Sequence, residues 1–530
     1  MRRIRLAAAF GFLFGAIVGC GSNGAKAPVD AGPVTDVPVE AQGDDGARDA
    51  IAGDTNPILP PDGTPPLAGV DSVFPARDGT AICTDAPLRL FFQSPPVLGT
   101  GGAIRVFDAS NPGTPVDSID LAAPASTITI SGRAFYYKPV IVAGNEVYVY
   151  LRKVLHAGAT YYVTIDAGVF LGTADGAATG APVGSVWEAS TWRFTVRAAA
   201  PAAGAAQVTV AADGTGDFCT VQGAVDYVPA GNTTPVTITV NQGNYREIVE
   251  ISAKHKITLY GEDRKLSVIT YPNNGQLQVP PGGTASLGTK FRAMLGADGA
   301  NDLTIENITL WNPSPQLSTN GQSETLRSEG GQRLILRNAD FKGLQDTLLI
   351  TGTAYAVDSY IEGNVDFIWG NGVVFFERCE IRDVVRKGYM VQARNVANSY
   401  GYVFVDSTFT ADPPTITGHF LARTDRNNLA PASQVAYVNC KLGPHISPLG
   451  WLVDGYERPA PDAGSTYDLT QLRFQEYQST DLAGALLDVS QRIPESKQLT
   501  ADEAAQMRDP TVVLGGWNPR GAVADAGSGN

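Results

Sequence analysis

Residues 343–370, GLQDTLLITGTAYAVDSYIEGNVDFIWG, hold two aspartates, Asp346 and Asp366, that stand 20 positions apart. Between them, Thr, Tyr, Val and Ile are interspersed with glycines, a composition that favours β-strands over a helix. When successive turns of a chain stack as coils of a parallel β-solenoid, one coil takes about 20 to 25 residues and neighbouring strands lie about 4.8 Å apart. The stretch therefore predicts that both carboxylates lie side by side on one face.

Two adjacent carboxylates have a definite chemistry. They do not easily both ionise, so one holds a proton while the other stays anionic. This supplies an acid together with a nucleophile or base, which is what hydrolysis requires. The alternative is that each aspartate only caps a turn.

The same strand-and-turn pattern continues on both sides of this stretch, from about residue 207 to 442. A short helix is expected over 220–227, and several strands end in turns that contain Asn. Repeats of roughly 20 to 35 residues fit a solenoid with loop insertions, whose long stacked faces suit a polymeric ligand. The clearest predicted strands are 208–210, 236–240, 256–260, 303–305, 334–336, 373–376, 402–405 and 435–438.

Residues 66–198 form a separate block of short alternating strands with regular turn signals, which predicts a β-sandwich. The run LHAGATYYVTIDAGVF at 155–170 and the closing WRFTV at 192–196 resemble bacterial Ig-like modules. The block holds no cluster of polar residues suited to catalysis, so we expect a spacer or a binding module. Its clearest strands are 88–92, 103–107, 146–150, 161–165 and 192–196.

The first 20 residues carry three arginines, an apolar run over 6–18 and then Cys20. The run is too short to span a bilayer, and the layout is that of a secretion signal. It resembles a bacterial lipoprotein signal in which Cys20 becomes lipidated; the alternative is an ordinary signal with an incidental cysteine. Residues 21–65 are rich in Pro, Ala, Gly and Asp and read as a solvated linker. We therefore expect an exported protein, lipid-anchored at a bacterial outer membrane or cell surface.

Composition excludes several classes of function. The net charge of −14 argues against a nucleic-acid partner. The five cysteines show no CxxC spacing, so no metal site or cofactor is expected, and spacing alone assigns no disulfide. The chain has only four histidines and no GxSxG elbow, which disfavours a Ser–His–Asp esterase.

A series of short motifs runs through residues 205–520. In order they read GNYRE at 243–247, GED at 261–263, QSETLR at 322–327, QDTL at 345–348, DFIWG at 366–370, VQAR at 391–394, LAR at 421–423 and GGWNP at 515–519. Each motif is weak alone, but the ordered set resembles the pectin methylesterase family, which are carbohydrate esterases with a right-handed parallel β-helix. The full expectation is an all-β chain: a signal peptide (1–20), a disordered linker (21–65), an Ig-like β-sandwich (66–198), a β-helix (205–520) and a flexible tail (521–530).

The resemblance implies hydrolysis of methyl esters in pectin, the homogalacturonan polysaccharide, with release of methanol. It implies Asp366 as nucleophile and Asp346 as general acid and base. Gln322 and Gln345 would donate hydrogen bonds to the oxyanion, and Arg423 would pair with Asp366. The alternatives are a stacked amide ladder for the two glutamines and a surface charge for the arginine.

Two departures from the family pattern leave the substrate open. Asp425 stands where the family carries a tryptophan that stacks on the sugar, so Trp369 and Trp451 are the candidates to bind the substrate in its place. Gln392 is a further candidate substrate-binding residue, and the alternative is that it only stacks within the solenoid. Glu324 adds a carboxylate where family members carry a small or apolar residue. Related esterases of non-pectin esters, or a non-catalytic carbohydrate-binding surface protein, are therefore the alternative functions.

Overall fold

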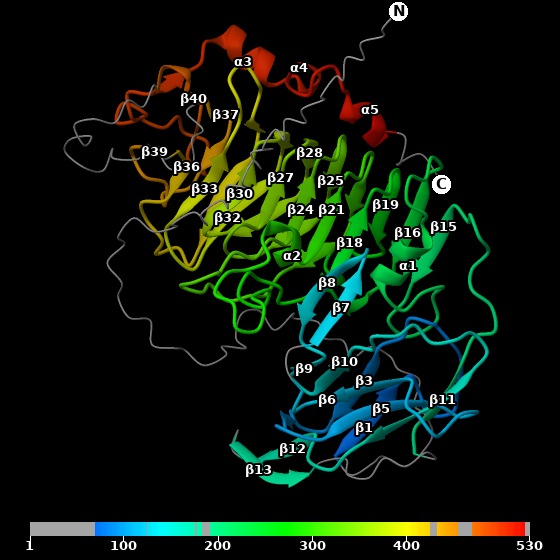
Figure 1. The fold of residues 1–530 in the computed structure, drawn as a ribbon. Helices are drawn as coiled ribbons and strands as arrows, with labels where there is room; N and C mark the ends of the chain where they lie inside the picture. Colours follow the sequence, from blue (N-terminus) through cyan, green and yellow to red (C-terminus); the bar gives the residue numbers. More distant parts are fainter. Residues whose placement is uncertain are drawn as a thin grey trace, which may run out of the picture. The chain divides into compact units, whose positions relative to one another are not determined.

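The computed structural model describes residues 69–123, 126–174, 177–182, 191–424, 432–453 and 469–524. The predicted signal peptide, linker, Cys20 and Asp425 lie outside these residues. The described part is mostly β-strand (Figure 1). None of its helices has the length and apolarity to cross a membrane.

The larger part of the described chain is a parallel β-helix made of three sheets, which confirms the predicted fold class. Each sheet takes one strand from nearly every coil. The first sheet contains β15 (Gln207–Val210), β16 (Val236–Val240), β19 (Ile257–Gly261), β22 (Thr304–Glu306), β25 (Leu334–Arg337), β28 (Thr353–Val357), β31 (Val373–Glu377), β34 (Tyr402–Val405), β37 (Gln434–Val438), β40 (Arg473–Tyr477) and β41 (Ser496–Gln498). The second contains β17 (Gly243–Arg246), β20 (Ser267–Thr270), β23 (Thr309–Trp311), β26 (Asp340–Lys342), β29 (Tyr360–Gly363), β32 (Glu380–Val384), β35 (Thr408–Asp412) and β38 (Lys441–Leu442). The third contains β18 (Val249–Ser252), β21 (Leu295–Asp298), β24 (Leu326–Glu329), β27 (Leu348–Ile350), β30 (Val365–Gly370), β33 (Tyr389–Ala393), β36 (Phe420–Thr424) and β39 (Trp451–Val453).

The turn that follows each strand of the first sheet explains the Asn signals in the sequence. Asn307 and Asn338 both have positive φ, 54° and 47°, which Asn tolerates better than most residues. The Asn338 side chain donates to Asn307 Oδ1 at 2.9 Å, so the turns of adjacent coils are also bonded to each other. The coil interior is filled by stacked aromatic rings, such as Phe376 on Phe404 with centroids 4.4 Å apart.

Residues before β15 form three sheets and a hairpin whose pairings are antiparallel, except for the parallel pairing of β2 with β14 inside one sheet. The strands predicted in this block are present, while its likeness to an Ig module stays a prediction. The first sheet contains β1 (Val70–Phe74), β3 (Leu88–Phe92), β10 (Glu146–Val149) and β9 (Val140–Ala143); the second contains β2 (Gly79–Ile82), β14 (Arg193–Val196), β11 (Thr160–Ile165), β5 (Ala103–Asp108) and β6 (Asp117–Asp120). A further sheet contains β13 (Ala177–Pro182), β12 (Phe170–Ala174) and β4 (Val97–Leu98), and the hairpin is β7 (Ser126–Ile130) with β8 (Arg133–Tyr137).

The described helices are short, and each borders the β-helix. The predicted helix over 220–227 is α1, whose N-terminal amides of Val221 and Gln222 donate to the Glu247 carboxylate at 2.7 and 2.9 Å. Glu247 of the GNYRE motif is therefore structural. The described helices are α1 (Val221–Tyr227), α2 (Thr289–Arg292), α3 (Ala501–Met507), α4 (Pro510–Val513), α5 (Pro519–Ala524) and a 3-10 turn at Leu469–Gln471.

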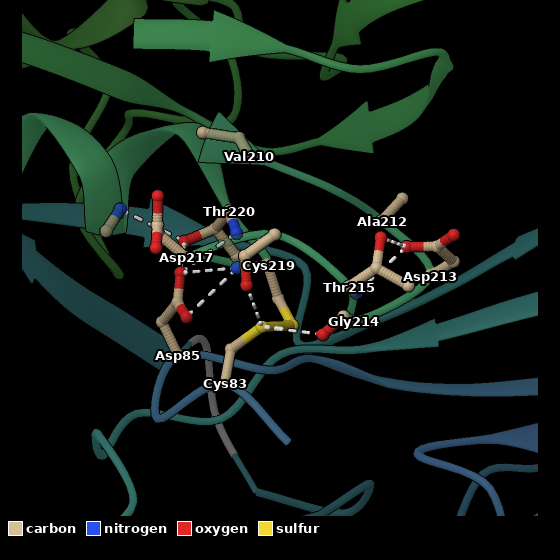
Figure 2. Close-up of a disulfide and its surroundings, with 12 residues drawn as sticks. Cys83, Asp85, Val210, Ala212, Asp213, Gly214, Thr215, Asp217, Cys219 and Thr220 are labelled. Atoms are coloured by element: carbon tan, nitrogen blue, oxygen red, sulfur yellow. Dashed lines mark hydrogen bonds between the residues drawn. A yellow bond between two sulfur atoms is a disulfide. The ribbon is translucent and has the colours of Figure 1, made fainter. Parts of the chain in front are cut away.

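A disulfide between Cys83 and Cys219 ties the antiparallel region to the start of the β-helix (Figure 2). Beside it, the Asp85 carboxylate accepts from the backbone N–H of Cys219 and Thr220 at 3.1 and 2.9 Å. The two thiols left among the described residues, Cys379 and Cys440, are buried core groups.

The β7–β8 hairpin packs against the N-terminal coils of the third sheet. Arg133 Nη1 lies 3.0 Å from Glu250 Oε2 on β18, and Arg133 also pairs with Asp298 on β21. Arg327 on β24 contacts the same Glu250 at 3.1 Å. Glu250 and Arg327 are both 0% exposed, so the hairpin covers the outer face of these coils. Phe135 of the hairpin also packs on Phe291 in α2, with ring centroids 5.4 Å apart.

Candidate active site

The third sheet brings three carboxylates into one column. Leu348 pairs with Ile368 and Gln345 bridges Val365, so Asp346 and Asp366 occupy equivalent positions on adjacent coils. One coil earlier, Leu326 pairs with Leu348, which puts Glu324 at the position equivalent to Asp346. The predicted juxtaposition of the two aspartates is thus present in the strand register, and Glu324 extends it.

Both aspartates sit in backbone conformations that side chains rarely adopt. The φ angles are 69° for Asp346 and 48° for Asp366. The register between β30 and β33 also shifts between Val365 and Ile368, so Asp366 lies at an irregularity of the ladder. Such irregularities redirect a side chain and concentrate at functional sites. Both aspartates are buried: Asp346 is 6% exposed and Asp366 is 2% exposed.

Arg423 on β36 holds the Asp366 carboxylate. Its Nε donates to Asp366 Oδ1 at 2.8 Å, and its Nη2 donates to Oδ2. This bidentate pairing fixes the carboxylate in a plane and compensates its charge. The guanidinium in turn lies 4.6 Å from the centroid of the Tyr389 ring. Arg423 is therefore a partner of Asp366 with a side chain only 13% exposed, and not an isolated surface charge.

Arg292 at the end of α2 is a site residue that the sequence did not reveal. Its Nε donates to both Glu324 oxygens at 2.9 Å, and its Nη2 donates to Asp346 Oδ2 at 3.0 Å. Glu324 is 0% exposed. Glu324, the carboxylate that departs from the family pattern, thus forms an ion pair with Arg292, and Arg292 also donates a hydrogen bond to Asp346. A basic residue 54 positions before Asp346 carries no periodic signal that could have found it.

The two glutamines lie on consecutive coils beside the aspartates. Ser323 N–H donates to the backbone oxygen of Gln345 at 3.3 Å, so the residue after Gln322 lies beside Gln345 across the ladder. Gln322, Gln345 and Asp366 therefore fall on three successive coils, as the spacing predicted. Their role as oxyanion donors stays a prediction.

Trp369 and Gln392 form the next cross-strand pair along the sheet. The Trp369 residue is 7% exposed, and guanidinium carbons of Arg394 and Arg292 lie 4.7 and 5.9 Å from its ring centroid. The Gln392 oxygen accepts from Arg394 Nε at 3.1 Å. Both residues border the site, and their contact with substrate stays a prediction.

Trp451 is not available to a substrate, which corrects one prediction. Its side chain is 0% exposed and stacks inside the coil on Phe474, with centroids 4.8 Å apart. The register explains the error: Trp451 pairs with Ala422, whereas Arg423 pairs with Leu452. Because successive side chains of a strand point to opposite faces, Trp451 faces the core when Arg423 faces the site.

A second polar cluster lies inside the coils, behind Phe367. Asp383 Oδ1 lies 2.9 Å from His419 Nε2, and Oδ2 lies 2.8 Å from His445 Nε2. Gly388 N–H donates to His419 Nδ1 at 3.0 Å. Burial raises the pKa of Asp383 to about 7 and lowers the pKa of His419 to about 3. With side chains at most 3% exposed, the cluster is enclosed and does not offer a histidine base to substrate.

The chain is similar to known proteins over the β-helix. The sequence model of the pectinesterase family matches residues 207–505. Pectinesterase 31 of Arabidopsis thaliana is 31% identical over 302 residues, which are 56% of this chain and 89% of the plant protein. A pectinesterase of Ralstonia nicotianae is 31% identical over 317 residues, with 52% and 79% coverage. Among solved structures, the pectin methylesterase from carrot has a TM-score of 0.50 at 24% identity and covers 61% of this chain and 96% of its own.

Proposed function

Because the chain belongs to the pectinesterase family, we propose that it hydrolyses methyl esters of polygalacturonate to methanol and pectate with Asp366 as nucleophile and Asp346 as general acid and base. The enzyme class is a carboxylic ester hydrolase. The observation that supports this division of roles is the asymmetry of the pair. Arg423 makes a bidentate contact with Asp366, whereas Asp346 faces the Arg292–Glu324 pair.

In the first half-reaction, an Asp366 oxygen attacks the ester carbonyl and a tetrahedral intermediate forms. Its collapse breaks the bond to the methoxy oxygen, which takes a proton from Asp346 and leaves as methanol. The product is an acyl-enzyme, a mixed anhydride on Asp366. Gln322 and Gln345 side-chain amides supply N–H donors to the oxyanion, a type of contact that is worth about 3 kcal/mol each.

In the second half-reaction, Asp346 is a carboxylate and accepts a proton from an incoming water. The resulting hydroxide attacks the acyl carbon, and the bond to Asp366 breaks. This releases the free acid of the sugar and restores a protonated Asp346 beside an ionised Asp366. Arg423 serves this step because it stabilises Asp366 as a leaving carboxylate.

The test is methanol release from highly methylated pectin by the full chain beside its Asp366→Asn and Asp346→Asn variants. We expect the first variant to lose at least about 10³-fold in kcat, because no acyl-enzyme can form. The second should fall in kcat more than in substrate affinity. A folded wild-type protein that releases no methanol from pectin but hydrolyses another methyl ester would move the assignment to that ester. An Asp366→Asn variant with full activity would contradict the nucleophile.

We also propose that the protein is exported and carries a lipid on Cys20 as its membrane anchor, which the lipoprotein-like residues 1–20 support. Growth of an expressing bacterium with a labelled fatty acid tests this directly. The label should enter the wild-type chain and be lost from Cys20→Ala. Label retained by the variant would contradict lipidation at this cysteine.

A further inference from the structure

The contact between Arg292 and Asp346 raises a chemical problem for the proposed acid. Asp346 must carry a proton when methoxide departs, yet a guanidinium at 3.0 Å favours the ionised carboxylate. An arginine alone at this distance would therefore oppose the first half-reaction. The structure contains a feature that resolves the conflict.

Glu324 binds the same guanidinium more extensively than Asp346 does. Arg292 donates three hydrogen bonds to Glu324, at 2.8 to 2.9 Å, and one to Asp346. The side chain of Glu324 is fully buried and that of Arg292 is 12% exposed. Because a buried carboxylate of this kind is paired with its cation, the Arg292–Glu324 pair presents Asp346 with a hydrogen-bond donor of no net charge.

Two other charged groups of the site have partners of their own. Asp366 on the next coil is neutralised by the bidentate contact of Arg423. Arg394 lies over Trp369 and binds the Gln392 oxygen. Arg292 binds both Glu324 and Asp346, so removing the charge of Arg292 or of Glu324 changes the balance of charge beside Asp346.

The position of Arg292 is fixed from outside the β-helix. The preceding residue, Phe291, packs on Phe135 of the β7–β8 hairpin, and its backbone oxygen accepts from the Asn273 side chain at 2.8 Å. The backbone oxygen of Glu324 accepts from Asn312 Nδ2 at 3.1 Å. Phe291 is thus held by the hairpin and by a buried asparagine of its own coil, and Glu324 by a buried asparagine of its own coil.

We infer that Arg292 and Glu324 are positioning residues that orient the Asp346 carboxyl and set the pH range over which it acts as the acid. This inference rests on the proposed function of Asp346. Arg292 supplies the orientation, and Glu324 cancels the charge that would otherwise ionise Asp346 too early. Together they determine where activity is lost on the alkaline side.

The test is the pH profile of kcat/KM for methanol release by wild type, Glu324→Gln, Arg292→Gln and the double variant. Glu324→Gln leaves an uncancelled cation beside Asp346, so the alkaline limb should move down by about 1 pH unit or more. Arg292→Gln leaves an uncancelled anion, so the limb should move up by a similar amount. The double variant restores neutrality, and its limb should return to within about 0.3 pH units of wild type.

If Arg292 and Glu324 had only a structural role, the two single variants would not shift the alkaline limb of the pH profile in opposite directions. Lys290→Gln is the matched control, because it removes an exposed cation from the same helix and should leave the limb in place. Single variants that leave the limb unmoved, or that move it in the same direction, would overturn the inference.

Two further measurements cover the remaining outcomes. Should a neutralising variant fail to fold, Arg292→Lys carries the test: the limb should stay and kcat should fall about tenfold or more through lost orientation. A displaced limb or an unchanged kcat would overturn the inference.

Should pectin prove not to be the substrate, infrared titration of the Asp346 carboxyl replaces the kinetic profile. The signal of this carboxyl is the difference between each protein and the same protein carrying Asp346→Asn. We expect the same shifts as in the pH profile, and unshifted titrations would overturn the inference.

Discussion

At the scale of single residues, substitution of Arg423 tests whether its two-bond contact orients and stabilises the Asp366 carboxylate. Arg423→Lys keeps a cation near Asp366 but cannot make the planar two-bond contact. We expect kcat/KM to fall about 10²-fold, and further in Arg423→Met, because the carboxylate loses both its orientation and its compensating charge. Steady-state kinetics beside Arg394→Lys provides the comparison. Equal losses in the two lysine variants would contradict a special role for Arg423.

The buried Asp383 and His419 allow a prediction about pH and stability. The raised pKa of Asp383, about 7, gives a contribution that is lost as the pH rises from about 4 to about 7. The lowered pKa of His419, about 3, gives a contribution that is lost as the pH falls from about 6.5 to about 3. Between about pH 4 and 6.5 these slopes oppose each other and cancel.

Asp383→Asn should remove one side of this balance. The free energy of unfolding of the variant, relative to wild type, should then fall by up to about 1.4 kcal/mol for each pH unit of acidification below about 6.5. Urea unfolding at pH 4.5, 5.5 and 6.5 measures the difference. Parallel curves for the two proteins would show that the pair does not titrate as described.

Residue-scale prediction succeeded where a side chain belonged to a repeated pattern. Asp346 and Asp366 stand one coil apart in strand-forming sequence, so their adjacency follows from the spacing. Arg292 could not be found, because it reaches the site from a loop between β20 and β21 whose conformation depends on the hairpin. Trp451 was misplaced because a shift of one residue along a strand exchanges the core for the outer face.

At the scale of elements, the β7–β8 hairpin supports the site from outside the β-helix. Phe135→Ala removes a fully buried ring that contacts α2, so stability should fall by about 3 to 5 kcal/mol. Loosening α2 should also lower kcat, since Arg292 follows the packed Phe291. Thermal unfolding and kinetics at a temperature where the variant is folded measure both effects.

A matched control separates the two effects of that substitution. Phe92 is a buried aromatic residue of the antiparallel core that packs on Phe170 and not on α2. Phe92→Ala should therefore lose similar stability while the folded enzyme keeps its kcat. A drop in kcat of the same size in both variants would argue that any weakening of the antiparallel region reaches the site. The sequence did not predict this support, because it offered no sign of which surface the hairpin contacts.

At the scale of the whole molecule, the Cys83–Cys219 disulfide is the covalent link between the antiparallel strands and the β-helix. It closes a loop of 136 residues, for which the loss of chain entropy predicts a stabilisation of up to about 5 kcal/mol. The Cys83→Ser/Cys219→Ser variant should show a correspondingly lower free energy of unfolding by calorimetry, and reductant should no longer affect it. An unchanged unfolding temperature would contradict the estimate.

The core of the antiparallel region and the core of the β-helix each contain residues from the other region, and the sequence did not predict this. Cys219 belongs to the core of the antiparallel region, while Phe135 and Tyr137 of the hairpin belong to the core of the β-helix. The predicted boundary between 198 and 205 marks the change from antiparallel to parallel strands. The domain boundary itself stays a prediction, because linear patterns do not show which side chains cross between cores.

The shared core also constrains the timing of biosynthesis. Chain synthesis at about 5 to 20 residues per second delivers Cys219 about 7 to 27 seconds after Cys83. During that interval the first cysteine has no partner, and the antiparallel core lacks one of its members. The link also closes only where thiols are oxidised, outside the cytosol. A newly made chain therefore completes its N-terminal region late, after the start of the β-helix has been synthesised and after the chain has reached an oxidising compartment.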